Sequence, residues 1–330
     1  MFQKMMKSPK AWWVCAAVGG ALIAVTAPAT AAEKLALGYV SADAVYGPWF
    51  YAQEKGYFQK HGLDTTLAFT DSGMKGMQAL LAGSIEICAC DGPSTTTAYL
   101  AGGDVRFIGV TLGKLSGNVY AAKDIKSSTE LKGKKWAISS FGSESNAAAL
   151  AALKYFGLSD KDVTIVQVGN QGNRFAALES GQVQVTTLLP PVSARAEDAS
   201  YPKLGELPVI APNFLSVAPV TSTKMLSERR EVVKAFLTAL AEATAAYKKD
   251  RAGGIAVLEK QLKITNPKNA ELAWNYYSPL NSSDLRPTSA SIQYFLDQSK
   301  DAKAKSTKPE DLMDLSVLDE ITKEGVFKTE

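Results

Sequence analysis

The sequence predicts an α/β protein with two lobes of similar design, each a mostly parallel sheet flanked by helices. Residues 77–87 align with residues 175–185 at an offset of 98, and residues 64–67 align with 162–165 at the same offset. In both copies apolar strands alternate with helices, which is typical of a parallel sheet covered on both faces. Two copies are too few for a solenoid, so the repeat indicates two lobes.

Each copy predicts the same order of elements: strand, helix, strand, helix, strand. The predicted strands are residues 34–40, 65–70 and 85–90 in the first copy, and 135–139, 163–168 and a third in the second. Pro48 suits the first turn of a helix, where its missing N–H needs no partner. A helix over residues 146–156 ends at Gly157, and Gly83 and Gly181 close the next helix in each copy.

The remaining segments complete the first lobe. Residues 105–110, 118–123 and 214–221 read as strands, and Ser227 can cap a long helix with an apolar face over residues 232–247. Further helices to the C-terminus are expected to be core and scaffold. The chain therefore crosses between lobes twice, which predicts a hinge and a cleft. The predicted bounds are residues 32–120 with 218–330 for the first lobe, and 121–217 for the second.

The first 31 residues predict a signal peptide. A basic segment, residues 4–10, precedes an apolar stretch, residues 11–27, and Ala29-Thr30-Ala31 fits the small-residue rule for cleavage after Ala31. A membrane anchor is the alternative, but the stretch is short for a bilayer span. Cys15 lacks the small preceding residue that lipidation needs. We therefore expect a soluble protein exported to the periplasm.

Composition and charge exclude several classes of function. Of the 330 residues 46% are hydrophobic and 21% charged, which is ordinary for a globular chain. Without the three lysines of the first 31 residues, 33 basic residues face 33 acidic ones, so no nucleic-acid partner is expected. The single histidine, His61, disfavours His-based metal sites and Ser-His-Asp chemistry. We predict no cofactor and no bound metal.

Two cysteines remain beyond the signal peptide, Cys88 and Cys90, on one predicted strand. Side chains at positions i and i+2 share a face of a strand, and a disulfide there would be strained. Buried free thiols are the favoured interpretation, although a bridge stays open.

Several segments resemble solute-binding proteins of ABC importers of the nitrate/sulfonate/taurine type. These are residues 51–63, residues 71–73 with 79–84, residues 131–135 and residues 177–181. The resemblance implies a periplasmic binding protein of the two-crossover, hinge-closing type (type II). It also implies a monomer that takes a small-molecule ligand to an inner-membrane permease with its ATPase. Gln184-Val185 stands where the family often has Asp-Ala, so no particular member's substrate carries over.

Ligand contacts are expected in the loops at the carboxyl ends of the strands. The first-lobe candidates are Tyr46, Trp49, Asp71, Ser72, Gly73, Asp91, Pro93, Ser94, Lys114 and Asn118. Trp49 could instead pack under its helix, and Asp71 could merely cap one. Lys114 lies near the first crossing and could equally be a surface residue.

The second-lobe candidates begin with a serine-rich loop at a helix start, a suitable place for an anion. They are Ser140, Phe141, Ser143, Asn146, Asn170, Arg174 and Pro191. Ser143 could be a plain N-cap. Arg174 could form a bidentate pair with a carboxylate or sulfonate, or could lie on the surface. We expect the ligand to be a small organic anion, with or without an aromatic ring.

Two other functions use the same architecture. Enzymes related by fold include a desulfinase with a cysteine nucleophile and a pyrimidine synthase that consumes an active-site histidine. A reactive thiolate needs a basic neighbour, and His61 lies in a turn expected to face solvent. We therefore predict that the chain is not an enzyme. The ligand-binding module of a periplasmic sensor remains an open alternative.

Overall fold

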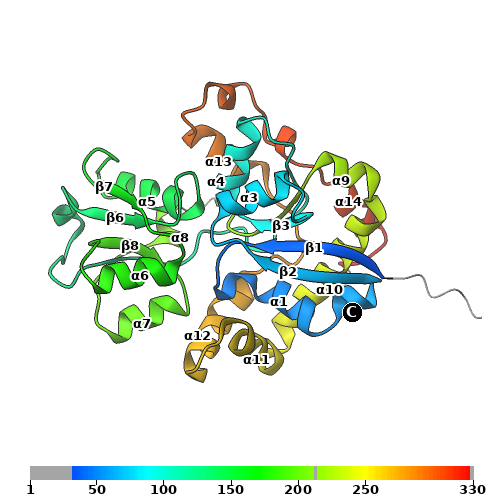
Figure 1. Ribbon diagram of the computed structural model, residues 1–330, viewed down its shortest axis with the longest axis horizontal. Helices are drawn as coiled ribbons and strands as arrows, with labels where there is room; N and C mark the ends of the chain where they lie inside the picture. The colour runs from blue at the N-terminus through cyan, green and yellow to red at the C-terminus, as the bar shows by residue number, and fades with distance from the viewer. Residues whose placement is uncertain (1–31, 212–213, 328–330) are drawn as a thin grey trace, which may run out of the picture. The chain divides into compact units, whose positions relative to one another are not determined.

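The computed structural model describes residues 32–211 and 214–327, and these form two five-stranded sheets (Figure 1). The predicted signal peptide and its cleavage after Ala31 lie outside the described residues. The strands of the first sheet, in spatial order, are β2 (Leu63–Phe69), β1 (Glu33–Tyr39), β3 (Ile87–Cys90), β10 (Ala218–Thr221) and β4 (Arg106–Phe107). Those of the second are β7 (Thr164–Gln167), β6 (Lys135–Ile138), β8 (Val185–Leu188), β5 (Asn118–Ala121) and β9 (Lys203–Glu206).

The two sheets have the same strand arrangement, and each includes one strand that the chain forms on arriving from the other lobe. In the first, β1 runs parallel to β2 and β3, while β10 is antiparallel to β3 and β4. In the second, β6 runs parallel to β7 and β8, while β5 is antiparallel to β8 and β9. The antiparallel strand in each sheet is the one that arrives from the other lobe. The predicted fold class, two lobes joined by two crossings, is confirmed.

The predicted lobe bounds, residues 32–120 with 218–330 and residues 121–217, remain predictions. The pairing of the strands shows only which sheet each strand joins. Residues 118–120 were assigned to the first lobe, but β5 pairs along its whole length with strands of the second sheet. The chain therefore enters the second sheet at Asn118. Below, the first lobe means the elements around the first sheet, and the second lobe those around the second.

Helices cover both faces of each sheet. In Figure 1, α3, α4 and α13 lie above the first sheet and α1, α10, α11 and α12 below it, while α5 lies above the second sheet and α6 and α7 below. The helices of the second lobe are α5 (Glu144–Tyr155), α6 (Gln171–Glu179), α7 (Val192–Asp198) and α8 (Leu207–Ile210). Those of the first lobe are α1 (Gly47–Glu54), α2 (Tyr57–Lys60), α3 (Gly73–Leu81), α4 (Gly92–Leu100), α9 (Thr223–Glu228), α10 (Arg230–Lys249), α11 (Arg251–Leu262), α12 (Pro267–Tyr277), α13 (Ser289–Gln298) and α14 (Ser316–Lys323). No helix within the described ranges is long and apolar enough to cross a membrane.

Local predictions were mostly confirmed at the helix ends. Pro48 occupies the first turn of α1, and Gly157 follows α5 with a left-handed φ of 73°. The prediction that Ser227 caps the long helix was wrong, because Ser227 lies inside α9, which Ser222 caps. The helix α10 then begins at Arg230 without a side-chain cap. Strand β4 is two residues long, shorter than the predicted 105–110.

Aromatic packing fixes the helices beneath the first sheet. Trp49 of α1 and Phe58 of α2 both contact Phe236 of α10, with ring centroids 5.2 and 5.7 Å apart. All three side chains are fully buried. The long C-terminal helix α10 therefore serves as scaffold for the first lobe, as the sequence predicted.

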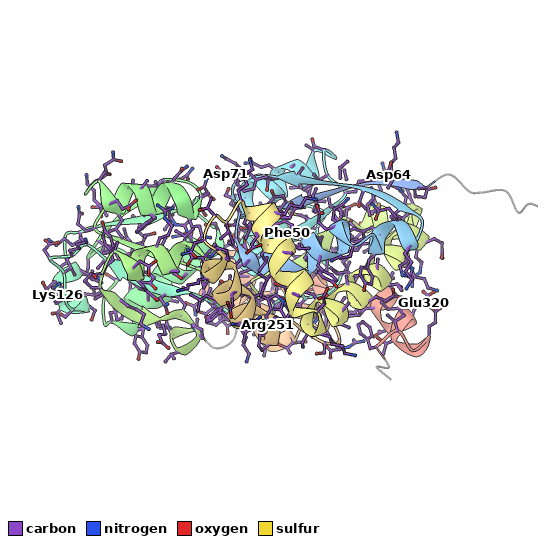
Figure 2. The ribbon with its side chains drawn as sticks, turned by 90° about the horizontal axis from the view of Figure 1, so that it is seen from below. Phe50, Asp64, Asp71, Lys126, Arg251 and Glu320 are labelled. Atoms are coloured by element: carbon purple, nitrogen blue, oxygen red, sulfur yellow. The ribbon has the colours of Figure 1, made fainter. Side chains whose placement is uncertain are left out.

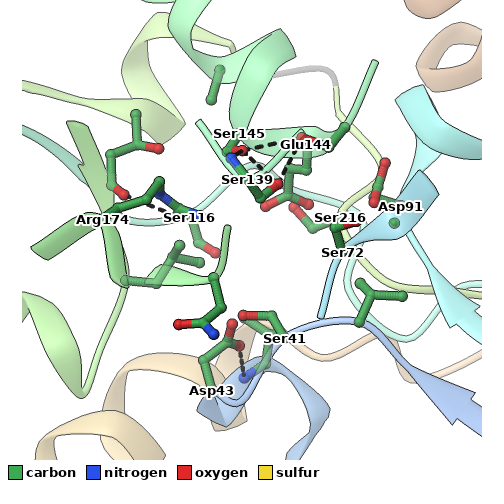
Figure 3. Close-up of a pocket in the computed structure, with 18 of the residues that line it drawn as sticks. Ser41, Asp43, Ser72, Asp91, Ser116, Ser139, Glu144, Ser145, Arg174 and Ser216 are labelled. Carbon is green, nitrogen blue, oxygen red and sulfur yellow. Dashed lines mark hydrogen bonds between the residues drawn. The ribbon is translucent and has the colours of Figure 1, made fainter. Parts of the chain in front are cut away.

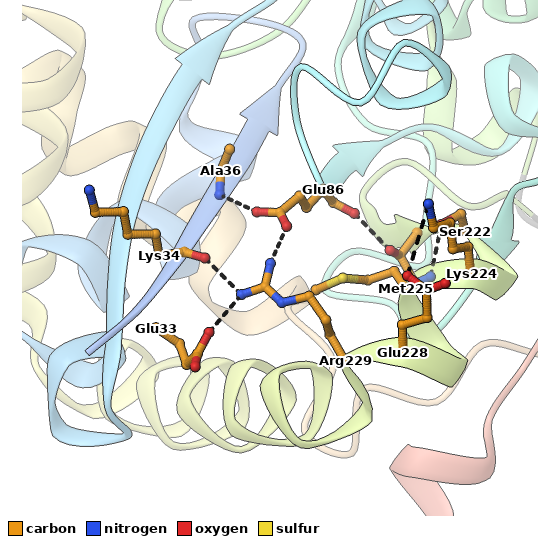
Figure 4. A network of polar contacts seen from close by, with 10 residues as sticks. Glu33, Lys34, Ala36, Glu86, Ser222, Lys224, Met225, Glu228 and Arg229 are labelled. Carbon is orange, nitrogen blue, oxygen red and sulfur yellow. Dashed lines mark hydrogen bonds and ion pairs between the residues drawn. The ribbon is translucent and has the colours of Figure 1, made fainter. Parts of the chain in front are cut away.

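A polar network ties the C-terminal helices to the N-terminal strand (Figure 4). Arg229, between α9 and α10, donates to the Glu33 carboxylate at 3.1 Å and to the Lys34 carbonyl oxygen at 2.9 Å. It also pairs with Glu86, whose carboxylate accepts from the Ala36 N–H at 3.0 Å. The outer end of the first sheet is thus held by side chains remote from the carboxyl ends of its strands.

Candidate functional site

A cavity of about 590 Å³, part of it open to solvent, lies where the loops of the two lobes meet (Figure 3). We call it the interlobe cavity. Its lining includes eight predicted site residues: Tyr46, Asp71, Ser72, Gly73, Asp91, Ser143, Asn170 and Arg174. Thirteen further residues that the sequence analysis had not selected also line it: Val40, Ser41, Asp43, Val45, Ser116, Ser139, Glu144, Ser145, Ala148, Thr187, Leu189, Leu207 and Ser216.

Arg174 is a buried cation in the cavity wall. It exposes 4% of its surface, so the alternative of a surface arginine was wrong. Its guanidinium donates to the Gly169 carbonyl oxygen at 2.9 Å, the Thr187 carbonyl oxygen at 3.2 Å and the Thr186 hydroxyl at 3.3 Å. These acceptors are neutral and use three of the five N–H groups of an arginine. Burial lowers the pKa of Arg174 to about 10, so it stays charged at neutral pH.

The loop of residues 139–145, the serine loop, joins the carboxyl end of β6 to the start of α5. The Ser139 hydroxyl lies 2.8 Å from those of Ser143 and Ser145. Ser143 occupies the N-cap position of α5, but its hydroxyl donates to the Ser140 carbonyl oxygen at 2.7 Å and caps no N–H. The alternative of a plain N-cap was therefore wrong. The Ser143 side chain therefore makes no cap hydrogen bond to the first turn of α5.

Four carboxyl groups line the cavity: Asp71, and three more of which two had not been selected from the sequence. Asp43 and Asp91 expose 2% each, and Glu144 is half-buried at the first position of α5. Burial raises the pKa of Asp43 and of Asp91 to about 6. Burial, together with the negative charges of Asp91 and Asp43, raises the pKa of Glu144 well above its usual value. We call these three groups the carboxyl cluster.

The backbone holds two of the acids in place. The Asp43 carboxylate accepts from the Val45 N–H at 3.0 Å, and the Asp91 carboxylate accepts from the Ser94 N–H at 2.7 Å. A side chain at Gly73 would come within 2.0 Å of an Asp91 carboxylate oxygen, so glycine is needed where α3 approaches α4. Acidic residues in loops after strands one and three could have signalled this cluster, but Glu144 resembled an ordinary first-turn helix residue.

Asp71 connects the two lobes. Its carboxylate accepts from the Asn170 amide at 2.9 Å, across the junction, and from Lys75 in its own lobe at 2.8 Å. The ion pair with Lys75 lowers the pKa of Asp71. Asp71 does not cap α3, as one alternative had it, because the Ser72 hydroxyl accepts from the Lys75 N–H. Its φ of 68° is a left-handed conformation that costs energy outside glycine. Figure 2 shows Asp71 where the two lobes adjoin.

Comparison with known proteins assigns the family. A family model described as "NMT1/THI5 like" matches residues 44–252, well over half of the chain. The chain belongs to the NMT1/THI5-like family. The predicted resemblance is confirmed, because sulfonate-binding and nitrate-binding periplasmic proteins are among the structural neighbours of this NMT1/THI5-like chain.

The structural neighbours share the fold at low sequence identity. A protein from Bordetella bronchiseptica superposes with a TM-score of 0.79 at 19% identity, over 88% of this chain and 98% of its own. The alkanesulfonate-binding protein SsuA of Xanthomonas axonopodis, bound to MOPS, gives 0.70 at 22%, over 81% and 92%. The nitrate-binding protein NrtA of Synechocystis gives 0.75 at 14%, over 89% of each chain. These similarities show the periplasmic binding protein fold.

Two further proteins match this chain, one in structure and one in sequence. A mutant of DszB in complex with biphenyl-2-sulfinic acid superposes with a TM-score of 0.64 at 14% identity, over 89% of this chain and 99% of its own. A Brucella abortus protein named only as a binding protein is 26% identical over 196 residues, 58% of this chain. The matched region spans 60% of the length of that relative.

Six predicted residues of this NMT1/THI5-like chain lie away from the interlobe cavity. Trp49 is buried under α1, where its indole N–H donates to the Thr111 hydroxyl, so it forms no wall of the cavity. Lys114 is exposed, and Asn118 donates to the Tyr120 hydroxyl. Ser94 and Ser140 are buried outside the lining, and Pro191 precedes α7. None of these six residues is part of the cavity lining.

The remaining three predicted residues line a second, outer hollow of about 1100 Å³. Pro93, Phe141 and Asn146 lie there with Tyr294 and Phe295 of α13. Phe141 is 59% exposed, so an aromatic group in the serine loop faces outward. The sequence placed these residues in the correct loops but could not assign the direction of each side chain.

The cysteines are buried and unbridged. Cys88 and Cys90 are both free thiols without exposed surface. Burial raises the pKa of Cys90, with Cys88 and Asp91 adding to the rise, which disfavours the reactive thiolate. The only histidine, His61, lies 3.1 Å from Glu242 of α10, away from the cavity. Within the described ranges, no cluster of His, Cys, Asp and Glu is arranged to hold a metal ion.

Proposed function

We propose that this chain is the periplasmic substrate-binding component of an ABC importer and captures a small organic anion between its lobes. The observation that carries the proposal is the interlobe cavity, where loops of both lobes surround the buried Arg174. The family and the fold support it, since SsuA and NrtA are named for binding sulfonates and nitrate. Residues 1–31 would direct export, and the mature monomer would deliver its ligand to a membrane permease with its ATPase.

The anion would lie between Arg174 and the start of α5. Arg174 has two N–H groups beyond those that bond Gly169, Thr186 and Thr187. The uncapped N-terminus of α5 contributes further donors and a partial positive charge. In a closed cavity each charge-assisted hydrogen bond contributes about 1.5–3 kcal/mol. A carboxylate or sulfonate has the oxygens to use several of them at once.

Closure would bring the lobes together around the ligand. The bond between Asp71 and Asn170 joins loops of the two lobes, and an exposed ion pair between Lys300 and Asp160 (3.1 Å) joins them again. Each lobe keeps its own sheet, so rotation at the two crossings need not disrupt either core. The polar contacts across the junction are few and replaceable by water, which suits reversible opening.

We also propose that the chain binds its ligand without transforming it. The thiol nearest the cavity, Cys90, is buried and has a raised pKa, and His61 is remote. The double substitution Cys88→Ser with Cys90→Ser should keep ligand affinity within a few fold. Loss of a ligand turnover that the wild type shows would revive an enzymatic function.

A thermal-shift screen of carboxylates, sulfonates and aromatic acids tests the proposed function. A true ligand at about 100 times its Kd should add roughly 2.7 kcal/mol to the free energy of unfolding. Isothermal titration of each hit should give one site per chain. A screen in which no compound of the three classes stabilises the protein would contradict the proposal. A periplasmic chain that still begins at Met1 would contradict the proposed cleavage.

A further inference from the structure

The outer hollow, like the interlobe cavity, has walls from both lobes. Helices α4 and α13 form its first-lobe wall, which includes the rings of Tyr294 and Phe295. Helix α5 forms its second-lobe wall, and Phe141 extends the wall from the serine loop. Figure 1 shows α4 and α13 above the first sheet and α5 above the second. A molecule in the outer hollow would therefore contact both lobes.

Apolar side chains remain exposed along the second-lobe wall. Phe141 exposes 59% of its surface and Leu150 exposes 39%. Ala147, Leu150 and Ala151 share one face of α5, because residues three and four apart are neighbours on a helix, and all three line the outer hollow. Apolar surface gathered in a concave site with aromatic walls is typical of a binding site for a small organic molecule.

The outer hollow carries no unbalanced charge. Among its lining residues only Lys300 and Asp160 are charged, and they form an ion pair with each other at 3.1 Å. The interlobe cavity differs, because one arginine and four acidic residues line it. A charged molecule in the outer hollow would lose water without gaining a free opposite charge. The lining therefore favours an uncharged ligand.

A buried hydroxyl in the first-lobe wall lacks a partner. Thr96 of α4 lines the outer hollow, is 3% exposed, and forms no hydrogen bond through its hydroxyl with any described residue. Other helical threonines donate to the carbonyl oxygen four residues earlier, as Thr95 does to Asp91 at 2.8 Å and Thr244 to Leu240 at 2.6 Å. Thr96 makes no such bond, although an unpaired buried hydroxyl is unfavourable. A rotation about χ1 would turn this hydroxyl towards a polar group of a ligand.

We propose that the outer hollow is a second binding site, which takes an uncharged aromatic compound with a hydroxyl or amide group. The ring packs between Leu150, Phe141 and the aromatic side chains of α13, and the polar group bonds Thr96. The inference goes beyond the proposed function, because this site is separate from the anion site at Arg174. The two sites share one wall, since Ser143 lines both cavities. An occupant that contacts both lobes favours the lobe arrangement in which both walls touch it.

Titration of the full chain with 2-naphthol, followed by the fluorescence of the probe at neutral pH, tests the site. We expect one site per chain. Leu150→Glu places a charge on the apolar wall and should weaken binding by about tenfold or more. Leu272→Glu, at a 55% exposed position of α12 outside the hollow, is the matched control and should leave the affinity unchanged. A folded wild type that does not bind 2-naphthol, or equal affinities for the two variants, would overturn the inference.

The role of Thr96 is tested with naphthalene, which lacks the hydroxyl of 2-naphthol. The wild type should prefer 2-naphthol over naphthalene by about fivefold or more. Thr96→Val keeps the shape of the side chain without its hydroxyl, so it should remove most of this preference and leave naphthalene binding within a few fold. A preference that persists in the variant would contradict the assignment of Thr96.

Hydrogen exchange locates the bound probe. With saturating 2-naphthol, backbone N–H groups of both α5 and α13 should exchange more slowly, because the occupant contacts both lobes. Protection confined to one lobe, or to the loops of the interlobe cavity without α13, would overturn the inference. None of these measurements requires the anion, so this site can fail while the proposed function stands.

Discussion

The two lobes share part of their scaffold residue for residue and differ in the chemistry they present to the cavity. Helices α3 and α6 have bounds exactly 98 residues apart, and so do β3 and β8. Ser72 and Asn170, also 98 apart, both cap their helices, accepting from Lys75 and Asn173 N–H groups. The repeat thus predicts where backbone elements begin and end.

The side chains at equivalent positions have diverged together. Arg174 corresponds to Gly76, where a side chain would lie 2.8 Å from Val40 and 3.0 Å from the Cys88 sulfur. Thr186, which accepts from Arg174, corresponds to Cys88. In the first lobe Val40 and Cys88 therefore occupy the space that the Arg174 side chain fills in the second lobe. The comparison indicates that the first lobe supplies three of the four lining acids and the second lobe the cation, while both lobes supply hydroxyls.

Removing the cation of the second lobe should have the largest effect. Arg174→Met should weaken binding of the acidic group by about 100-fold or more, because it removes the only lining cation. It should also lower the free energy of unfolding by about 2–4 kcal/mol, since three acceptors lose their donor. Titration and urea unfolding measure both effects. Arg195→Met, on exposed α7, is the matched control, and equal affinities for the two variants would contradict the assignment.

Adding a side chain at the equivalent position of the first lobe should damage stability alone. Gly76→Ala places a methyl group against Val40 and Cys88, and we expect a loss of about 1–3 kcal/mol in the free energy of unfolding. Ligand affinity of the folded variant should stay within a few fold. Gly113→Ala, where the nearest atom lies 3.9 Å away, is the control. A Gly76→Ala variant as stable as the wild type would show that the first lobe also has room for a side chain at this position.

The acids of the first lobe should make stability depend on pH. The pKa of Asp43 is raised in the folded state from 3.8 to about 6, so between these values the folded protein binds more protons than the unfolded chain. Asp43 therefore costs nothing below pH 4 and costs about 3 kcal/mol above pH 6. Asp43→Asn should gain about that much over the wild type between pH 4 and pH 7, measured by urea unfolding. A constant difference across this range would argue against a buried, unpaired carboxyl group.

A serine that lines the cavity and a serine that caps a helix should respond differently to substitution by alanine. Ser143→Ala should weaken ligand binding about tenfold, because its hydroxyl lines the cavity and caps no N–H. Ser222→Ala removes the cap of α9, which accepts from the Met225 N–H, and should cost about 1 kcal/mol of stability without changing affinity. Titration and thermal melting of both variants make the comparison. A Ser143→Ala variant that loses only stability would place Ser143 with the helix and not with the ligand.

The sequence predicted the scaffold better than the site, for a physical reason. Apolar period, proline and glycine positions are local signals, and they placed both sheets and the helix closed by Gly181. Whether Asp43 is buried, or Trp49 faces a cavity, depends on which segments from distant parts of the chain pack together. Arg174 was found because its chemistry is distinctive. Glu144 was missed because its unusual environment comes from burial at the junction and from Asp91 and Asp43 in the other lobe.

The central claim, that a ligand is enclosed between two hinged lobes, is tested most directly by small-angle X-ray scattering. We expect a small decrease in the radius of gyration when the wild-type protein is saturated with a ligand confirmed by titration. The Arg174→Met variant, at the same ligand concentration, should show no decrease. An unchanged radius of gyration for the wild type with a confirmed, tightly bound ligand would contradict closure.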